Sequence, residues 1–150
     1  MADHLRTQIR EQVVSELTGL ATTGSNIFES RVYPMESAGL PGIIIYTTDE
    51  VVEADQSSTT SSGRRLVRFL TLKIEGYAKA ETDVDDTLDT IAKEVEEKIA
   101  GSTIGGLVKD VVLAETEIEL TAESEQPVGR LNLTYQIHYE TYEGDVDAAA

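Results

Sequence analysis

Apolar residues return at every fourth position near the start of the chain, and this spacing is that of an α-helix with one buried face. The helix is expected to start near His4, with Asp3 as its N-terminal cap, and to end at Gly19. Its apolar stripe consists of Leu5, Ile9, Val13 and Leu17. A helix with a single apolar stripe needs a larger layer to pack against.

A second helical stripe follows the middle of the chain and ends at Gly101. Either Thr82 or Asp83 is expected to cap this helix, and the neighbouring Asp85 and Asp86 suit its positive end. The stripe is formed by Val84, Leu88, Ile91, Ala92, Val95 and Ile99.

Five segments have the alternating or continuously apolar pattern of β-strands. They are residues 27–33, 42–52, 64–78, 108–120 and 130–142. The last has the clearest alternation, with one face made of Leu131, Leu133, Tyr135, Ile137 and Tyr139. In the fourth, the residues expected to share a face are Val112, Ala114, Thr116, Ile118 and Leu120.

These elements predict a single α/β (α+β) domain over residues 1–150, in the order helix, three strands, helix, two strands. The sheet is expected to be mixed but largely antiparallel, with four to five strands. Two helices with one apolar face each can cover only one face of such a sheet. The other face should be polar or semi-polar and available for contacts.

Two segments lack apolar side chains large enough to anchor them. Residues 53–63 carry six consecutive Ser or Thr residues and are expected to form a mobile hairpin loop. Residues 143–150 are small and acidic and are expected to form a frayed tail.

The charge excludes one class of function. Asp and Glu number 28 against 12 Lys and Arg, which gives a net charge of −16. Binding to nucleic acid without sequence preference requires cations that neutralise phosphates, so this chain should repel DNA. Taken alone, the acidity is best explained by solubility. The charged first ten residues do not suit a signal peptide, and no apolar run is long enough to span a membrane.

No group of residues in the sequence predicts catalysis or metal binding. The chain has no Cys, and its two histidines, His4 and His138, are expected on the surface. Four acids between Asp83 and Asp89 could be read as a cation site, but acids are also expected at a helix start. We therefore expect no enzyme activity, no cofactor and no metal.

The segment from Ile9 to Glu50 carries a family resemblance. Its marks are a helix stop at Leu17-Thr18-Gly19-Leu20, a strand exit at Arg31-Val32-Tyr33-Pro34, a corner at Leu40-Pro41-Gly42, and Tyr46 to Glu50. In these elements the chain resembles the tail terminator proteins of long-tailed phages, the lambda minor tail protein U family. The order of the remaining elements agrees more loosely.

The resemblance implies a structural virion protein that forms a hexameric ring, caps the tail tube, ends its polymerisation and provides the surface for head–tail joining. The implied partners are other copies of the chain, the tail tube protein and a head completion or connector protein. Assembly is implied in the host cytoplasm, with the protein at the head-proximal end of the tail. Another connector, a tail tube protein, and a carboxylate-based cation-binding domain or enzyme are the alternatives.

In a ring, the acidity gains a possible role. Six copies at −16 each would carry −96, and genomic DNA would pass an acidic lumen without specific binding. A ring with a neutral or basic lumen would contradict this hypothesis.

Contacts with neighbours are expected in and beside the segment 53–63, where three of the twelve basic residues gather. These arginines are expected to meet acids of a neighbour, although ordinary strand-edge charges explain them equally well. The candidate contact residues are Asp49, Glu50, Glu53, Asp55, Arg64, Arg65 and Arg68.

Overall fold

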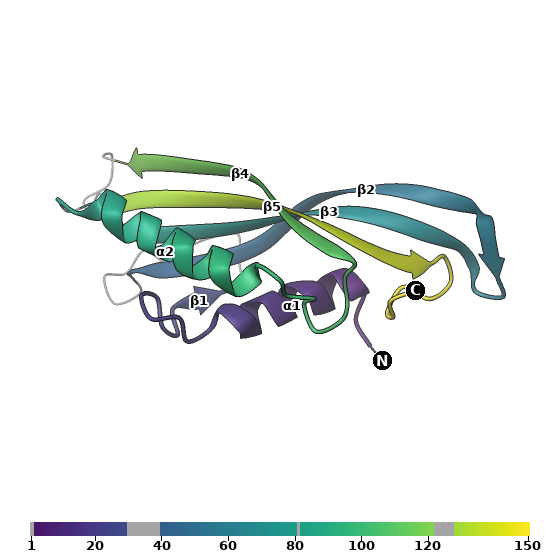
Figure 1. Cartoon of the computed structure of the whole chain (residues 1–150). Helices are drawn as coiled ribbons and strands as arrows, with labels where there is room; N and C mark the ends of the chain where they lie inside the picture. Colours follow the sequence, from purple (N-terminus) through teal and green to yellow (C-terminus); the bar gives the residue numbers. More distant parts are fainter. Residues whose placement is uncertain (1, 30–39, 81, 122–127) are drawn as a thin grey trace.

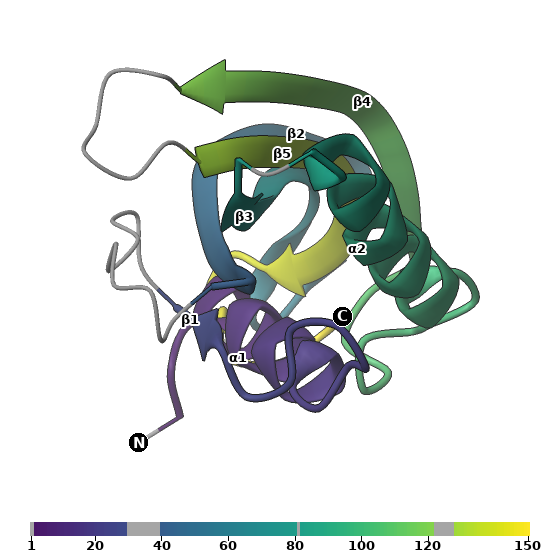
Figure 2. The same cartoon turned by 90° about the vertical axis from the view of Figure 1, so that its left-hand side faces the viewer.

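In the computed structural model, which describes residues 2–29, 40–80, 82–121 and 128–150, two helices lie on one side of a five-stranded sheet (Figures 1 and 2). The element order is the predicted one, and the α+β class is confirmed. The strands follow the order β1-β2-β3-β5-β4 across the sheet. Only the β1–β2 pair is parallel, so the sheet is mixed and largely antiparallel, as predicted.

Helix α1 (Leu5–Leu17) buries the predicted stripe completely. Its N-terminal cap is His4 and not Asp3, because the imidazole Nδ1 of His4 accepts a hydrogen bond of 3.0 Å from the backbone N–H of Arg6. The helix stops where Thr18 turns extended and Gly19 takes a φ of +95°, a conformation that glycine adopts without strain.

Helix α2 (Val84–Ile99) also buries its predicted stripe, and Asp85 and Asp86 stand in its first turn. Asp83 occupies the cap position, but its side chain makes no capping hydrogen bond. The acids at this end act through the helix dipole rather than through a capping bond from Asp83.

The centre of the sheet is the pair β3 (Gly63–Lys79) and β5 (Val128–Tyr142). The two strands pair without a register shift from Arg65 opposite Tyr142 to Lys79 opposite Val128. Because side chains alternate along both strands, one face of the pair is consistently apolar and meets the helices. That face carries Leu70, Leu72, Ile74, Leu131, Leu133, Tyr135, Ile137 and Tyr139, all buried.

Strand β2 (Gly42–Thr60) is eight residues longer than predicted, and the expected loop over residues 53–63 is wrong. Residues 53–55 and 59–60 pair with β3, and the turn is confined to Ser61 and Ser62. Backbone pairing with β3 does not require apolar side chains, so a Ser/Thr-rich segment can form a strand. Two register shifts interrupt the pairing, one between Thr47 and Glu50 and one between Asp55 and Thr59.

The expected frayed tail over residues 143–150 is also wrong. The backbone N–H of Leu5 donates to the carbonyl of Val146 at 2.8 Å, and that of Ala150 donates to the carbonyl of Glu140 at 2.8 Å. The amide of Gln8 adds a bond of 2.8 Å to the carbonyl of Asp147. The tail therefore lies against the start of α1 and the end of β5, and backbone hydrogen bonds hold it there even though it has no large apolar side chain.

The two edges of the sheet differ from the sequence expectation in detail. Strand β1 (Ile27–Phe28) confirms the start of the strand predicted over residues 27–33, while residues 30–39, including the predicted strand exit, lie outside the described residues. At the other edge, β4 (Asp110–Thr121) shifts register between Leu113 and Glu115. Neither described helix has the length and apolar character needed to cross a bilayer.

The close approach of α2 to β5 generates a prediction. A Cβ atom at Gly129 would lie 2.6 Å from Cγ2 of Val84 and 3.0 Å from Cδ1 of Leu88. Gly129→Ala should therefore lower the free energy of unfolding by about 2 kcal/mol through overpacking. Denaturant unfolding measures this loss.

The matched control is the cycle with Val84→Ala, which removes the clashing methyl group. The double variant should be more stable than the sum of the two single losses predicts. Strict additivity would mean that the contact between Gly129 and Val84 is looser than described.

Candidate assembly interface

The β2–β3 hairpin extends beyond the helix layer at one end of the molecule, as Figure 1 shows. We call residues 51–67 the arm. Neither α1 nor α2 lies beneath the arm, so its side chains do not belong to the main core. Four of the seven candidate contact residues lie in the arm, and the other three lie at its base: Asp49, Glu50 and Arg68.

A buried charged cluster anchors the base of the arm. The carboxylate of Glu50 accepts hydrogen bonds from Nη1 of Arg68 at 2.8 Å, from Nη1 of Arg6 at 3.0 Å and from the hydroxyl of Tyr139. Nε of Arg68 donates to Oγ1 of Thr141 at 3.0 Å. The cluster therefore joins α1, β2, β3 and β5 at one point.

The register shift in β2 creates this cluster. With strict alternation, Asp49 would share the face of Thr47, but the shift places Glu50 opposite Leu70 on the helix-covered face. Both Glu50 and Arg68 are only 9 % exposed at their side chains. Burial, the hydrogen bond to Glu50 and its negative charge all raise the pKa of Tyr139, so its hydroxyl stays a donor.

Arg64 and Arg65 pair with acids of the same chain, at the end of β5 and in the tail. Arg64 donates from Nε to Oε1 of Glu143 at 3.0 Å and from Nη2 to Oε2 at 3.2 Å, and these bonds lower the pKa of Glu143. Nε of Arg65 lies 3.7 Å from Glu140, and its guanidinium stands over the ring of Tyr142. All of these groups are partly exposed, so contact with an acid of a neighbour stays a prediction.

The remaining three candidates are acids near the surface. Asp49 and Glu53 are exposed, and Asp49 accepts a hydrogen bond of 2.9 Å from Oγ1 of Thr48. Asp55 accepts hydrogen bonds from the hydroxyl and the backbone N–H of Ser57, and these bonds lower its pKa. Their predicted role in contacts between subunits is not tested by a single chain.

The helix-free face of the sheet is mixed: a buried apolar cluster of Ile44, Tyr77 and Val128 lies on it, and elsewhere its polar side chains bind one another across strands. Nζ of Lys73 donates to Oγ1 of Thr134 at 2.8 Å, and the amide of Gln136 donates to Oγ1 of Thr71 at 2.9 Å. The rings of Phe69 and His138 stack with centroids 5.1 Å apart, so His138 lies on this partly exposed face. These contacts order the polar part of the free face.

One carboxylate on the free face is deeply buried. Glu75, 4 % exposed, accepts hydrogen bonds from the hydroxyls of Tyr77 and Tyr46 and forms an ion pair of 3.2 Å with Arg130. Arg130 in turn lies 3.3 Å from Glu119 of β4. This network links β2, β3, β5 and β4 across the face and leaves the carboxylate fully bound.

The sequence interpretation missed two exposed apolar sites. Val51 and Val52 are exposed in the arm, and Ile118 and Leu120 are exposed on β4. The prediction that Val112 shares a face with these β4 residues is wrong, since the bulge near residue 114 turns Val112 onto the free face. In the arm, the sequence signal for an exposed apolar site was the pair Val51-Val52 directly before a polar segment.

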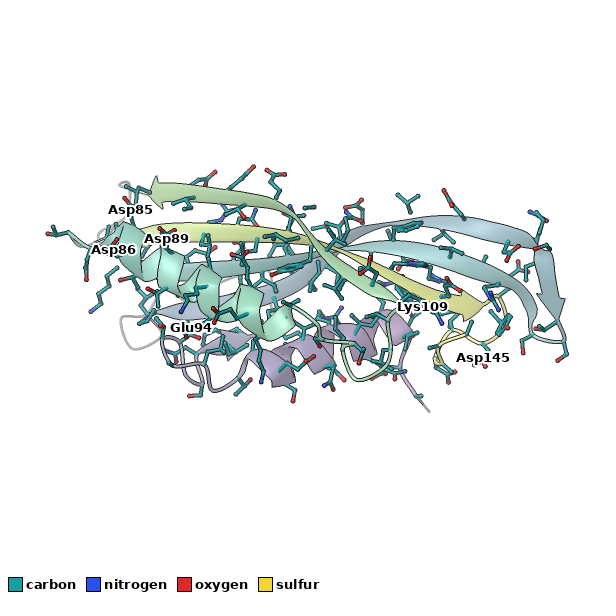
Figure 3. The ribbon with its side chains drawn as sticks, viewed as in Figure 1. Asp85, Asp86, Asp89, Glu94, Lys109 and Asp145 are labelled. Carbon is teal, nitrogen blue, oxygen red and sulfur yellow. The ribbon has the colours of Figure 1, made fainter. Side chains whose placement is uncertain are left out.

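The acids at the start of α2 show no arrangement for metal binding. Figure 3 shows Asp85, Asp86 and Asp89 at the end of the molecule where β4 ends, opposite the arm. Within the described residues, no group of three or more acidic or histidine side chains is arranged to hold a metal ion.

The Glu50 cluster generates a stability prediction. Glu50→Gln keeps the shape of the side chain but leaves Arg68 buried without its counter-ion, and should lower the free energy of unfolding by about 3 kcal/mol. Glu53→Gln, three residues further along an exposed strand, is the matched control and should change it by less than about 0.5 kcal/mol. Equal effects of the two substitutions, measured by urea unfolding, would contradict a structural role for the cluster.

Comparison with known proteins identifies the family. No curated protein matches the chain. A chain of a solved structure described as "Virion of native gene transfer agent (GTA) particle" matches with a TM-score of 0.52 and 15 % identity, over 92 % of this chain and 96 % of that one, which shows a shared fold. The family described as Phage minor tail protein U matches residues 4–139, nearly the whole described domain. The chain therefore belongs to the phage minor tail protein U family and is a structural protein of a phage tail.

Proposed function

We propose that this protein is a tail terminator: a ring that caps the tail tube, stops its polymerisation and presents a surface for head–tail joining. The family match over residues 4–139 is the observation that carries the proposal. The role is structural and non-enzymatic, and it requires contacts with other copies, with the tail tube protein and with a head completion or connector protein.

The arrangement of the chain supports a ring. A ring forms when a subunit contacts its neighbour through two different surfaces that close on rotation. The chain has distinct surfaces for such contacts: the arm, the polar free face and the open outer edge of β4. The number of subunits, six, is implied by the family resemblance.

The acidity supports the passage of DNA without binding. Glu115, Glu117 and Glu119 line the free face of β4, where the neighbouring carboxyl group of Glu115 raises the pKa of Glu117. Carboxylates this close to one another mark a strongly negative surface. If this surface lines the lumen, phosphate groups are repelled and the genome slides through.

The proposal predicts tube capping. Tail tube protein polymerising with the purified chain should form tubes of limited length with a ring at one end, visible by negative-stain imaging. Tube protein alone should form longer tubes without end rings. If the chain is incorporated along the tube, it is a tube protein. If it leaves tube length unchanged and binds only a head-side protein, it is a connector.

A second prediction concerns the tip of the arm. Deletion of residues 57–62 removes the turn and the last strand residues without touching the buried core. The variant should unfold close to the wild-type temperature but lose tube capping or head joining. Normal tail length together with normal joining to heads would show that the tip of the arm is dispensable.

A further inference from the structure

Among the described residues, the exposed apolar pairs Val51–Val52 and Ile118–Leu120 lie at opposite ends of the sheet. The arm forms one end, where Thr60 pairs with Gly63. At the other end Thr121 of β4 pairs with Val128, which itself lies opposite Lys79, the last residue of β3. Figure 1 shows the same separation. Contacts that join opposite ends of successive subunits are heterologous, the type that closes rings.

The arm carries apolar side chains on both of its faces. Val52 lies opposite Arg68 on the helix-side face and is 44 % exposed, while Val51 lies opposite Phe69 on the free face and is 58 % exposed. The backbone N–H groups of Glu143 and Gly144 donate to Arg64 and Ser62 of the arm, but neither valine is covered by its own chain. Such a pair on a projecting element is typical of a segment that is buried in a neighbour.

A groove at the opposite end offers a matching surface. It lies between α2 and β4, measures about 420 Å³, and is lined by Asp89, Ala92, Lys93, Glu96, Glu97, Thr116 and Leu131. Along β4, Ile118 and Leu120 continue the face of Thr116 and are 45 % and 60 % exposed. The outer edge of β4 is the end of the described sheet, so the groove is open on that side.

Charge favours the arm as the occupant of this groove. The charged groove-lining residues are three acids and one lysine, a net charge of −2. In the arm, Glu53 and Asp55 balance Arg64 and Arg65, so its net charge is zero in a chain of −16. Because the chain is acidic, most other surfaces of a second copy would place acids against the acidic groove. The arm places arginines and valines there instead.

We propose that the arm of each subunit docks in the α2–β4 groove of the next copy, with Val52 packed against Ile118 and Leu120. This interface rests on the proposed ring and specifies how the ring closes. Exposed carboxylates of the groove, Asp89 and Glu97, then face the partly exposed Arg64 and Arg65 of the neighbour. The occupant is a second copy of this chain because only that pairing covers both apolar sites in every subunit.

The chain has no cysteine, so engineered thiols report contacts without background. In rings assembled with tail tube protein, the double variant Val52→Cys with Leu120→Cys, treated with a short bis-maleimide, should give a covalent ladder up to the full ring on a denaturing gel. The matched control is Val52→Cys with Val112→Cys. Val112 is comparably exposed, at 51 %, but lies on the free face and should give no ladder.

Charge insertion gives an independent measurement. Val52→Asp and Leu120→Asp should each weaken ring association by at least about tenfold, as expected for central apolar contacts, while Val112→Asp should leave it unchanged. All three positions are exposed in the isolated chain, so the fold should tolerate each change.

The outcomes separate this interface from the proposed function. Rings that cap tubes but give no ladder with Val52→Cys and Leu120→Cys would overturn the interface and leave the terminator role standing. A wild-type chain that neither forms rings nor caps tubes would overturn the terminator role and the interface with it. A ladder between Val52→Cys and a cysteine on the tail tube protein, without one between copies, would assign the arm to the tube.

Discussion

The uninterrupted pairing of β3 with β5 is the constraint on which this structure depends. Fifteen residue pairs share one register, so alternate side chains of each strand stay on the same face along the whole pair. One face is apolar and packs against α1 and α2. The other carries cross-strand hydrogen bonds that include Lys73, Thr134 and Gln136. A slip by one residue would exchange these two faces, so the apolar residues of both strands together specify the register.

The flanking strands depart from strict alternation, and these departures shape the surfaces. In β2 the bulge before Glu50 brings a carboxylate under the arm, where Arg6, Arg68 and Tyr139 bind it. In β4 the bulge after Leu113 turns Thr116, Ile118 and Leu120 toward α2 and leaves them exposed beside it. The two bulges thus position both the base of the arm and the opposite groove.

Much of the fold was predictable because it follows periodicity. The stripes of α1 and α2, the alternation of β5 and the presence of one helix-free face were all predicted and are confirmed. Of the candidate contact residues, Glu50 and Arg68 lie buried in a cluster of the same chain. Charge and sequence proximity do not reveal a bulge, so the direction of these side chains was not accessible from the sequence.

The sequence by itself determined the element order, the helix-covered core and the acidic character, since these depend on residue types and their spacing. Only the tertiary structure decided that residues 53–60 extend a strand and that the tail is bound, because both depend on backbone hydrogen bonds to distant segments. The placement of Val52 and Leu120 at opposite ends of the sheet was decided in the same way. Backbone pairing is nearly independent of side-chain type, and therefore a polar segment such as the arm can form a strand that its composition does not predict.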